Sequence, residues 1–130
     1  MKKTKHALIL FAHGSRNPQW ADPFKRIRDQ LASKHPESSI TLAYWELMEP
    51  NLEKAIGDLV DQNVGRITLI PLFMAQGGHL KEDLPKLIAD IQRRHSDLVF
   101  NIMPPIGEVD TILYAIAEWA SQVFVENDLR

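Results

Sequence analysis

Two histidines follow short apolar runs of the chain that are expected to form buried strands. His13 comes directly after the run at residues 8–12, and His79 comes shortly after a second run that begins at Ile70. Open parallel α/β sheets bind ligands at the carboxyl ends of their strands, so both imidazoles are expected at a binding edge. A neutral imidazole can hold a divalent metal ion or accept a proton near neutral pH. The two positions therefore indicate metal binding or proton transfer.

The residues beside these histidines suit a bulky ligand that carries negative charge. Gly14 follows the first histidine, and Gly77 and Gly78 precede the second, so the backbone can approach a ligand closely at both places. Arg16 and Lys81 lie just beyond the two histidines and supply positive charge at the same edge. Each cation is also consistent with an ordinary surface residue that binds no ligand, because most surface cations are solvated or form weak ion pairs.

Two further side chains are candidates for this site. Glu46 follows the apolar run at residues 40–45, where it could accept a proton or share a metal ion, or be a surface carboxylate in an ion pair. Ser15 stands beside His13, but adjacent residues rarely have the geometry of a nucleophile and its base, and no G-x-S-x-G motif occurs. We therefore expect Ser15 to form a hydrogen bond within its loop. Ser15 is also a candidate for substrate binding. A histidine after a strand is itself more often structural than a ligand.

Apolar runs alternate with helix-period segments along the chain, which predicts a parallel sheet with crossover helices. Strands are expected at residues 7–12, 40–45, 66–73 and 98–103. Three runs are nearly continuous in apolar residues, as in strands covered on both faces, whereas Thr41 and Tyr44 make the second an edge strand. The sequence predicts a single α/β domain over residues 1–130. Its expected fold is a flavodoxin-like (chelatase-like) four-stranded parallel sheet in the order 2-1-3-4, with helices on both faces.

Apolar stripes at helical spacing predict four helices. The stripes are Trp20, Phe24, Ile27 and Leu31; Leu52, Ala55, Ile56, Leu59 and Val60; Leu84, Leu87, Ile88 and Ile91; and Ile112, Ile116, Trp119 and Val123. Pro50 and Pro85 are expected near helix starts, with Glu82 or Asp83 capping the third helix. Gly65 is expected to close the second helix.

The composition argues against several classes of function. The chain has 130 residues, no cysteine and a formal net charge of −2. Without cysteine, a metal ion must be bound by imidazole, carboxylate or water, and without a basic face a general nucleic-acid binder is not expected. No run approaches the ~20 apolar residues of a membrane helix, and the basic start lacks a signal peptide's apolar core, so we expect a soluble cytoplasmic domain. Neither phosphate-loop motif occurs, which disfavours nucleotide hydrolysis and dinucleotide redox chemistry.

Three segments of the chain resemble one enzyme family. They are FAHGSR at residues 11–16, ELMEP at residues 46–50 and PLFMAQGGHLKEDLP at residues 71–85. Together they resemble the class II tetrapyrrole chelatases, and most of all the short, single-domain sirohydrochlorin cobaltochelatases of the CbiX type. The most specific part is the Gly-Gly-His-x-x-x-Asp-x-Pro element within the third segment.

The resemblance implies insertion of a divalent metal ion into sirohydrochlorin without ATP, on a route to cobalamin or sirohaem. It implies that His13 and His79 bind the incoming metal and take protons from pyrrole nitrogens, with Glu46 as a helper. No permanent cofactor is expected, and the metal is a substrate. Imidazole suits Co²⁺, Fe²⁺ and Ni²⁺ alike, so the sequence does not name it. A short chain of this kind is expected to form a homodimer that pairs two half-sites around the macrocycle.

Two other functions compete with this interpretation. A non-catalytic tetrapyrrole or metal carrier would use the same histidines for affinity alone, and insertion would then run at the uncatalysed rate. A small phosphohydrolase with His13 as nucleophile is suggested only by the strand-His-Gly start. It is disfavoured because Ala12 stands where histidine phosphatases have arginine.

Overall fold

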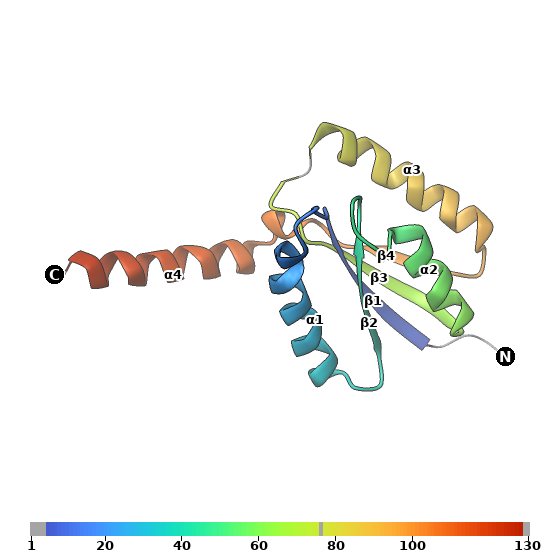
Figure 1. Ribbon diagram of the computed structural model, residues 1–130, viewed down its shortest axis with the longest axis horizontal. Helices are drawn as coiled ribbons and strands as arrows, with labels where there is room; N and C mark the ends of the chain where they lie inside the picture. Colours follow the sequence, from blue (N-terminus) through green and yellow to red (C-terminus); the bar gives the residue numbers. More distant parts are fainter. Residues whose placement is uncertain (1–4, 76, 129–130) are drawn as a thin grey trace.

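The computed structural model describes residues 5–75 and 77–128, and a four-stranded parallel sheet forms its centre (Figure 1). The strands are β1 (Lys5–Ala12), β2 (Ser39–Tyr44), β3 (Val64–Pro71) and β4 (Val99–Ile102). They lie in the order β2-β1-β3-β4, and every neighbouring pair is parallel. The predicted fold class and strand order are confirmed, as is the edge position of the second strand.

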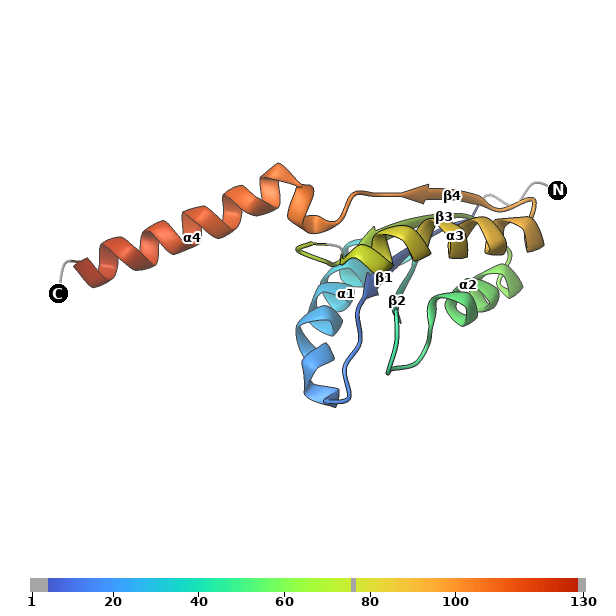
Figure 2. The same cartoon turned by 90° about the horizontal axis from the view of Figure 1, so that it is seen from above.

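Helices cover both faces of this sheet, although not completely (Figures 1 and 2). They are α1 (Asp22–Lys34), α2 (Leu52–Asp61), α3 (Gly78–Arg94) and α4 (Asp110–Asp128), with short 3₁₀ turns η1 (Pro18–Ala21) and η2 (Ile106–Glu108). The apolar stripes of α2 and α3 pack on one face of the sheet, in a core with Ile9, Phe11 and Ile67. The other face carries a smaller core, in which η1 and α1 pack on β1 and β2 around Leu10 and Leu42.

The burial of β3 departs from the expectation of a strand covered on both faces. Ile67 and Leu69 are buried, whereas Arg66 is exposed and Thr68 and Ile70 are only half-buried. The reason is that α1 packs on β2 and β1, and no described helix packs on the same face of β3 and β4. A stretch of the sheet is therefore open on one side.

Helix α4 explains this open face. The predicted stripe of Ile112, Ile116, Trp119 and Val123 does lie on a helix, but none of the helix's residues is buried. Both views show α4 extending away from the sheet, with the C-terminus at its far end (Figures 1 and 2). The stripe thus predicts the helix correctly, but the helix does not bury this stripe against its own sheet.

Two predicted helix ends also differ from the structure. Gly65 lies in β3; α2 ends earlier, at Asp61, where Asn63 takes the left-handed conformation with φ 66°. Helix α3 begins at Gly78 with extended Gly77 before it, so neither Glu82 nor Asp83 caps it. Pro85 consequently lies inside α3, on its exposed side, where water can solvate the carbonyl that loses its partner.

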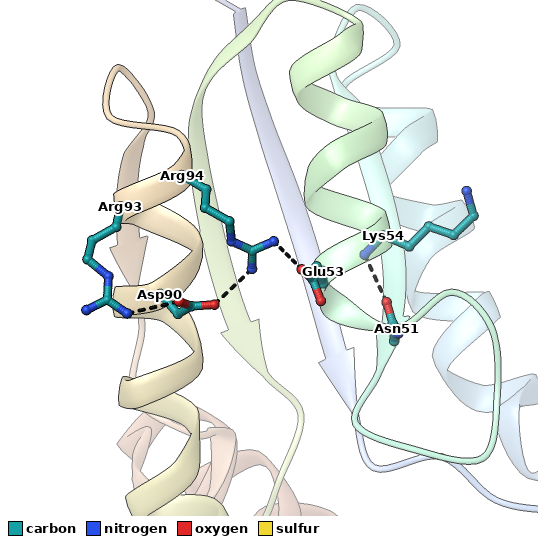
Figure 3. A network of polar contacts seen from close by, with 6 residues as sticks. All are labelled: Asn51, Glu53, Lys54, Asp90, Arg93 and Arg94. Atoms are coloured by element: carbon teal, nitrogen blue, oxygen red, sulfur yellow. Dashed lines mark hydrogen bonds and ion pairs between the residues drawn. The ribbon is translucent and has the colours of Figure 1, made fainter.

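An ionic network joins α2 to α3. Figure 3 shows Arg94 of α3 reaching between Asp90 of the same helix and Glu53 of α2, with hydrogen bonds to both. The hydrogen bond from Arg93 and the charge of Arg94 hold the pKa of Asp90 below its usual value. Because these side chains are exposed, the network contributes little to the stability of the fold.

The core of α2 can be tested against an exposed isoleucine. Ile56 is 0% exposed and Ile27 of α1 is 42% exposed, and both are helical. We expect Ile56→Ala to lower the free energy of unfolding by about 2–4 kcal/mol and Ile27→Ala by less than about 1 kcal/mol. Urea unfolding followed by circular dichroism measures both, and equal losses would contradict this assignment of the core.

Candidate active site

The loops that follow the strands are held together by backbone hydrogen bonds that continue the pairing of the sheet. The N–H of Trp45 donates to the carbonyl of Ala12 at 2.8 Å, and the N–H of Glu46 donates to the carbonyl of His13 at 3.0 Å. The pairing of β1 with β2 thus continues beyond both strands. The structure brings Glu46 and His13 together as backbone partners at the carboxyl edge, and both side chains are exposed.

A chain of aromatic contacts supports the His13 imidazole. Its ring lies 4.2 Å from the ring of buried Phe73, centroid to centroid, at 42°. Phe73 packs edge-on against Phe11 at 5.6 Å, and Phe11 in turn against Trp45 at 6.2 Å. The imidazole therefore rests on the hydrophobic core while remaining accessible to solvent. Since Phe73 follows β3, this contact also joins the β1 loop to the loop that leads into α3.

Gly14 is required by the geometry of this edge. Its φ is +97°, and a Cβ placed there would lie 1.8 Å from the carbonyl oxygen of Glu46. An alanine at this position would have to move the backbone that holds His13 beside Glu46. Gly14, which is expected to let a ligand approach the backbone, thus also permits a close contact within the chain.

His79 and Lys81 lie in the first turn of α3, and both side chains are exposed. Gly77 and Gly78 have nothing within 4 Å of a Cβ built on them, and neither has a positive φ. Their backbone conformation does not require glycine. Because the two residues have no side chains, they leave open space beside His79. Among residues 5–75 and 77–128, no side chain caps the start of α3, which leaves the N–H groups of its first turn available to an acceptor.

Exposed apolar side chains follow three of the strands at this same edge. They are Leu47 after β2, Met74 after β3 and Met103 after β4. These three residues, the apolar rim, offer contact area for a flat hydrophobic ligand. Of the three, Met74 stands out in the sequence because it leads into the segment that carries Gly77, Gly78 and His79. Leu47 and Met103 do not stand out, because a single exposed apolar residue has no periodicity. For Met103, the Pro-Pro pair that follows marks the end of its strand and was an available signal.

Ser15 and Arg16 lie in the loop between His13 and η1. The Ser15 Oγ accepts a hydrogen bond from the N–H of Asn17 at 3.1 Å, as expected of a local loop contact, and its own proton remains free to donate. Arg16 is exposed, and among the described residues neither Arg16 nor Lys81 forms an ion pair. Both cations are thus available to a charged ligand.

The candidate site is an open surface of the sheet edge. Within residues 5–75 and 77–128, no three or more His, Cys, Asp or Glu side chains form a group that could hold a metal ion. A cavity of about 220 Å³ lies at the opposite edge, where Arg94, Asp97 and Leu98 line it, and none of the predicted site residues takes part. No described helix is both long and apolar enough to cross a membrane.

Comparison with known families agrees with this architecture. The model of the CbiX family matches residues 7–123. This chain belongs to the CbiX family. A CbiX protein of cobalamin (vitamin B12) biosynthesis from Marinobacter aquaeolei has the same fold, with a TM-score of 0.81 and 29% identity, over 93% of this chain and 98% of the other.

Curated relatives carry one common name. The sirohydrochlorin cobaltochelatase of Methanosarcina acetivorans is 31% identical over 85 residues, 65% of either chain, and that of Saccharolobus islandicus is 24% identical over 126 residues, covering 92% of this chain and 97% of the other. This chain spans less than two thirds of the length of several curated sirohydrochlorin cobaltochelatases that it matches. The sirohydrochlorin chelatase SirB of Bacillus subtilis, solved with cobalt, shares the fold with a TM-score of 0.72, and this chain covers 51% of it.

The tight contact at Gly14 can be tested against a glycine that has room. Gly14→Ala is expected to lower the free energy of unfolding by about 2 kcal/mol or more, because of its positive φ and the collision with the Glu46 carbonyl. Gly57→Ala, in α2 with nothing within 4 Å, should raise it by about 0.5–1 kcal/mol. Thermal and urea unfolding report both, and a stable Gly14→Ala variant would refute the steric argument.

Proposed function

We propose that this protein inserts a divalent metal ion, with cobalt as the first candidate, into sirohydrochlorin without ATP. The proposal is supported by two exposed histidines, one directly after β1 and one in the first turn of α3, together with the apolar rim of a CbiX-family sheet. Cobalt is placed first because the curated relatives are sirohydrochlorin cobaltochelatases, while imidazole would equally accept iron or nickel. The reaction would take place in the cytoplasm as a step toward cobalamin or sirohaem.

Metal insertion requires ligands and bases together, and the histidines supply both. The metal ion replaces two pyrrole protons, so each turnover gives the metallated macrocycle and two protons. In this proposal His13 and His79 hold the incoming ion through ring nitrogens and accept the departing protons, which then pass to solvent. Glu46, held beside His13 by its backbone hydrogen bond, is a nearby acceptor for one of them.

The remaining candidates would bind the macrocycle. The apolar rim suits its flat face, and the space beside Gly77 and Gly78 admits it next to His79. Arg16 and Lys81 would pair with its carboxylates, and the uncapped first turn of α3 would favour the same charges. The Ser15 hydroxyl could donate one further hydrogen bond.

We also propose that the working unit is a homodimer of two facing half-sites. Two imidazoles fill only part of the coordination sphere of a divalent ion, and one open edge covers only one side of a planar ligand. The resemblance to short chelatases favours pairing of two copies. The length of Bacillus SirB, of which this chain covers 51%, supports the same arrangement, since that chain has room for two such units.

Removal of either imidazole tests the assigned chemistry. His13→Ala and His79→Ala should each lower kcat/KM for cobalt insertion into sirohydrochlorin by about 100-fold or more, because a ligand and base is lost. His95→Ala is the matched control, since this histidine ends α3 at the other edge of the sheet. Insertion is followed by the change in sirohydrochlorin absorbance.

The results of this insertion assay distinguish an enzyme from a carrier protein. Full turnover by His79→Ala would show that this residue has no catalytic role. Tight binding of sirohydrochlorin by the wild type, with insertion no faster than the uncatalysed background, would identify a carrier in place of an enzyme.

Lys81 provides a test of substrate binding that leaves the chemistry in place. Lys81→Ala should raise KM for sirohydrochlorin about 3–10-fold with little change in kcat, because an exposed charge-assisted hydrogen bond is lost. Lys86→Ala, on the next exposed turn of α3, removes the same charge farther along the helix and should leave KM unchanged. Equal effects of both substitutions would indicate a general charge effect and contradict a specific contact.

A further inference from the structure

Helix α4 exposes more apolar surface than a helix of a folded protein normally leaves in water. It spans Asp110–Asp128, and none of its residues is buried. Tyr114, Trp119 and Phe124 are exposed by 67%, 66% and 72%. Contiguous exposed apolar surface of this kind marks an interaction site in a soluble protein.

The apolar side of α4 is broad. One stripe carries Ile112, Ile116, Trp119 and Val123, and a second stripe next to it carries Leu113, Ala117, Ala120 and Phe124. Neighbouring stripes at helical spacing form one continuous face, wider than the roughly 100° that a helix needs to pack on a core. The helix therefore has the sequence of an element that covers a sheet, although it does not cover its own.

The sheet has a matching uncovered surface. On β3, Arg66, Thr68 and Ile70 point to the side that α1 leaves open, and their neighbours on β4 in register include Val99 and Asn101. Val99 is exposed although it is a large apolar residue inside a strand. Parallel sheets are normally covered on both faces, so this surface, the open face, is incomplete in the single chain.

The lengths and charges of the two surfaces fit each other. A helix of 19 residues is about 28 Å long, and a strand of 8 residues such as β3 is about 26 Å long. The described part of α4 carries four carboxylates, at Asp110, Glu118, Glu126 and Asp128, and no Lys or Arg. The open face carries Arg66, with His6 beside it on β1.

The start of α4 is fixed to the body of the protein. The N–H of Gly107 donates to the carbonyl of Phe73 at 3.1 Å, and a Cβ on Gly107 would lie 1.5 Å from the carbonyl oxygen of Met74. This contact holds η2 against the loop after β3, and α4 leaves from there directly away from the sheet (Figure 2). The helix therefore does not cover the sheet of its own chain.

We propose that α4 docks on the open face of a second copy of this chain, so that two copies exchange their C-terminal helices. Full burial of an aromatic side chain removes about 150–250 Å² from water. The two rings on the apolar side, Trp119 and Phe124, are each about two-thirds exposed, so two helices together supply on the order of 400–700 Å², before aliphatic side chains and the sheet are counted. A stable interface needs about 1,200–2,000 Å², which the exchange can reach.

This exchange rests on the homodimer of the proposed function and gives that homodimer a contact surface. It does not depend on which metal is inserted, or on whether insertion is catalysed at all. The test therefore measures the oligomeric state of the protein in solution, and this measurement is independent of the chelatase assay.

Substitutions on the two surfaces test the exchange separately. Sedimentation velocity of the wild type at low micromolar concentration should show a dimer. Trp119→Lys on α4 and Val99→Glu on the open face should each raise the dimer dissociation constant about 30-fold or more, because each places a charge in the apolar contact. Val125→Lys adds the same charge on the opposite side of α4, where Val125 is exposed, and should leave the dimer intact. Circular dichroism verifies that every variant folds.

Mixing the variants identifies the partner of α4. The Val99→Glu chain keeps an intact helix and the Trp119→Lys chain keeps an intact open face, so their mixture should form a heterodimer although each alone is monomeric. A mixture of Trp119→Lys with Phe124→Lys, both altered on α4, should stay monomeric. If Val99→Glu fails to fold, Arg66→Glu replaces it as the open-face variant.

Three results would overturn the proposal. A monomeric wild type would mean that α4 folds back on its own sheet or stays free. A Trp119→Lys variant that remains dimeric would place the interface elsewhere. Failure of the mixture to associate, with both variants folded, would mean that α4 meets a surface other than the open face, such as the α4 of the other copy.

Discussion

The site of this protein depends on backbone pairing that runs past the ends of its strands. Two hydrogen bonds beyond β1 and β2, from Trp45 to Ala12 and from Glu46 to His13, bring the loops of two separate crossover units into contact. Gly14 makes this approach possible, because the Glu46 carbonyl occupies the position of a side chain. Without this pairing, the histidine and the carboxylate would lie on independent loops and their separation would not be set by the sheet.

The same scaffold supports the His13 imidazole on the hydrophobic core and leaves the ring accessible to solvent. Phe73 and Phe11 lie in the hydrophobic core, yet the His13 ring that rests on Phe73 is exposed to solvent. Metal insertion needs both properties, since a ligand and base must be held in place while a large macrocycle enters and leaves. Helix α4, fixed at its start by Gly107, leaves its apolar side exposed in the single chain.

Much of this architecture follows from the sequence, for identifiable reasons. Continuous apolar runs mark the strands, and the right-handed crossover rule then gives their order and brings the loops after β1 and β3 to one edge. The need for Gly14 involves a carbonyl far away in the sequence, so no local pattern shows it. The stripe on α4 predicts that the helix buries a face but says nothing about which molecule provides the partner surface. Leu47 and Met103 belong to the rim only because the sheet brings three loops together.

The most direct test of the central claim is a crystal structure of the protein soaked with cobalt, with the ion located by anomalous scattering. We expect cobalt at the carboxyl edge of the sheet, within direct coordination distance of the imidazole nitrogens of His13 and His79. Cobalt bound by other residues, with these two imidazoles free of the ion, would contradict it.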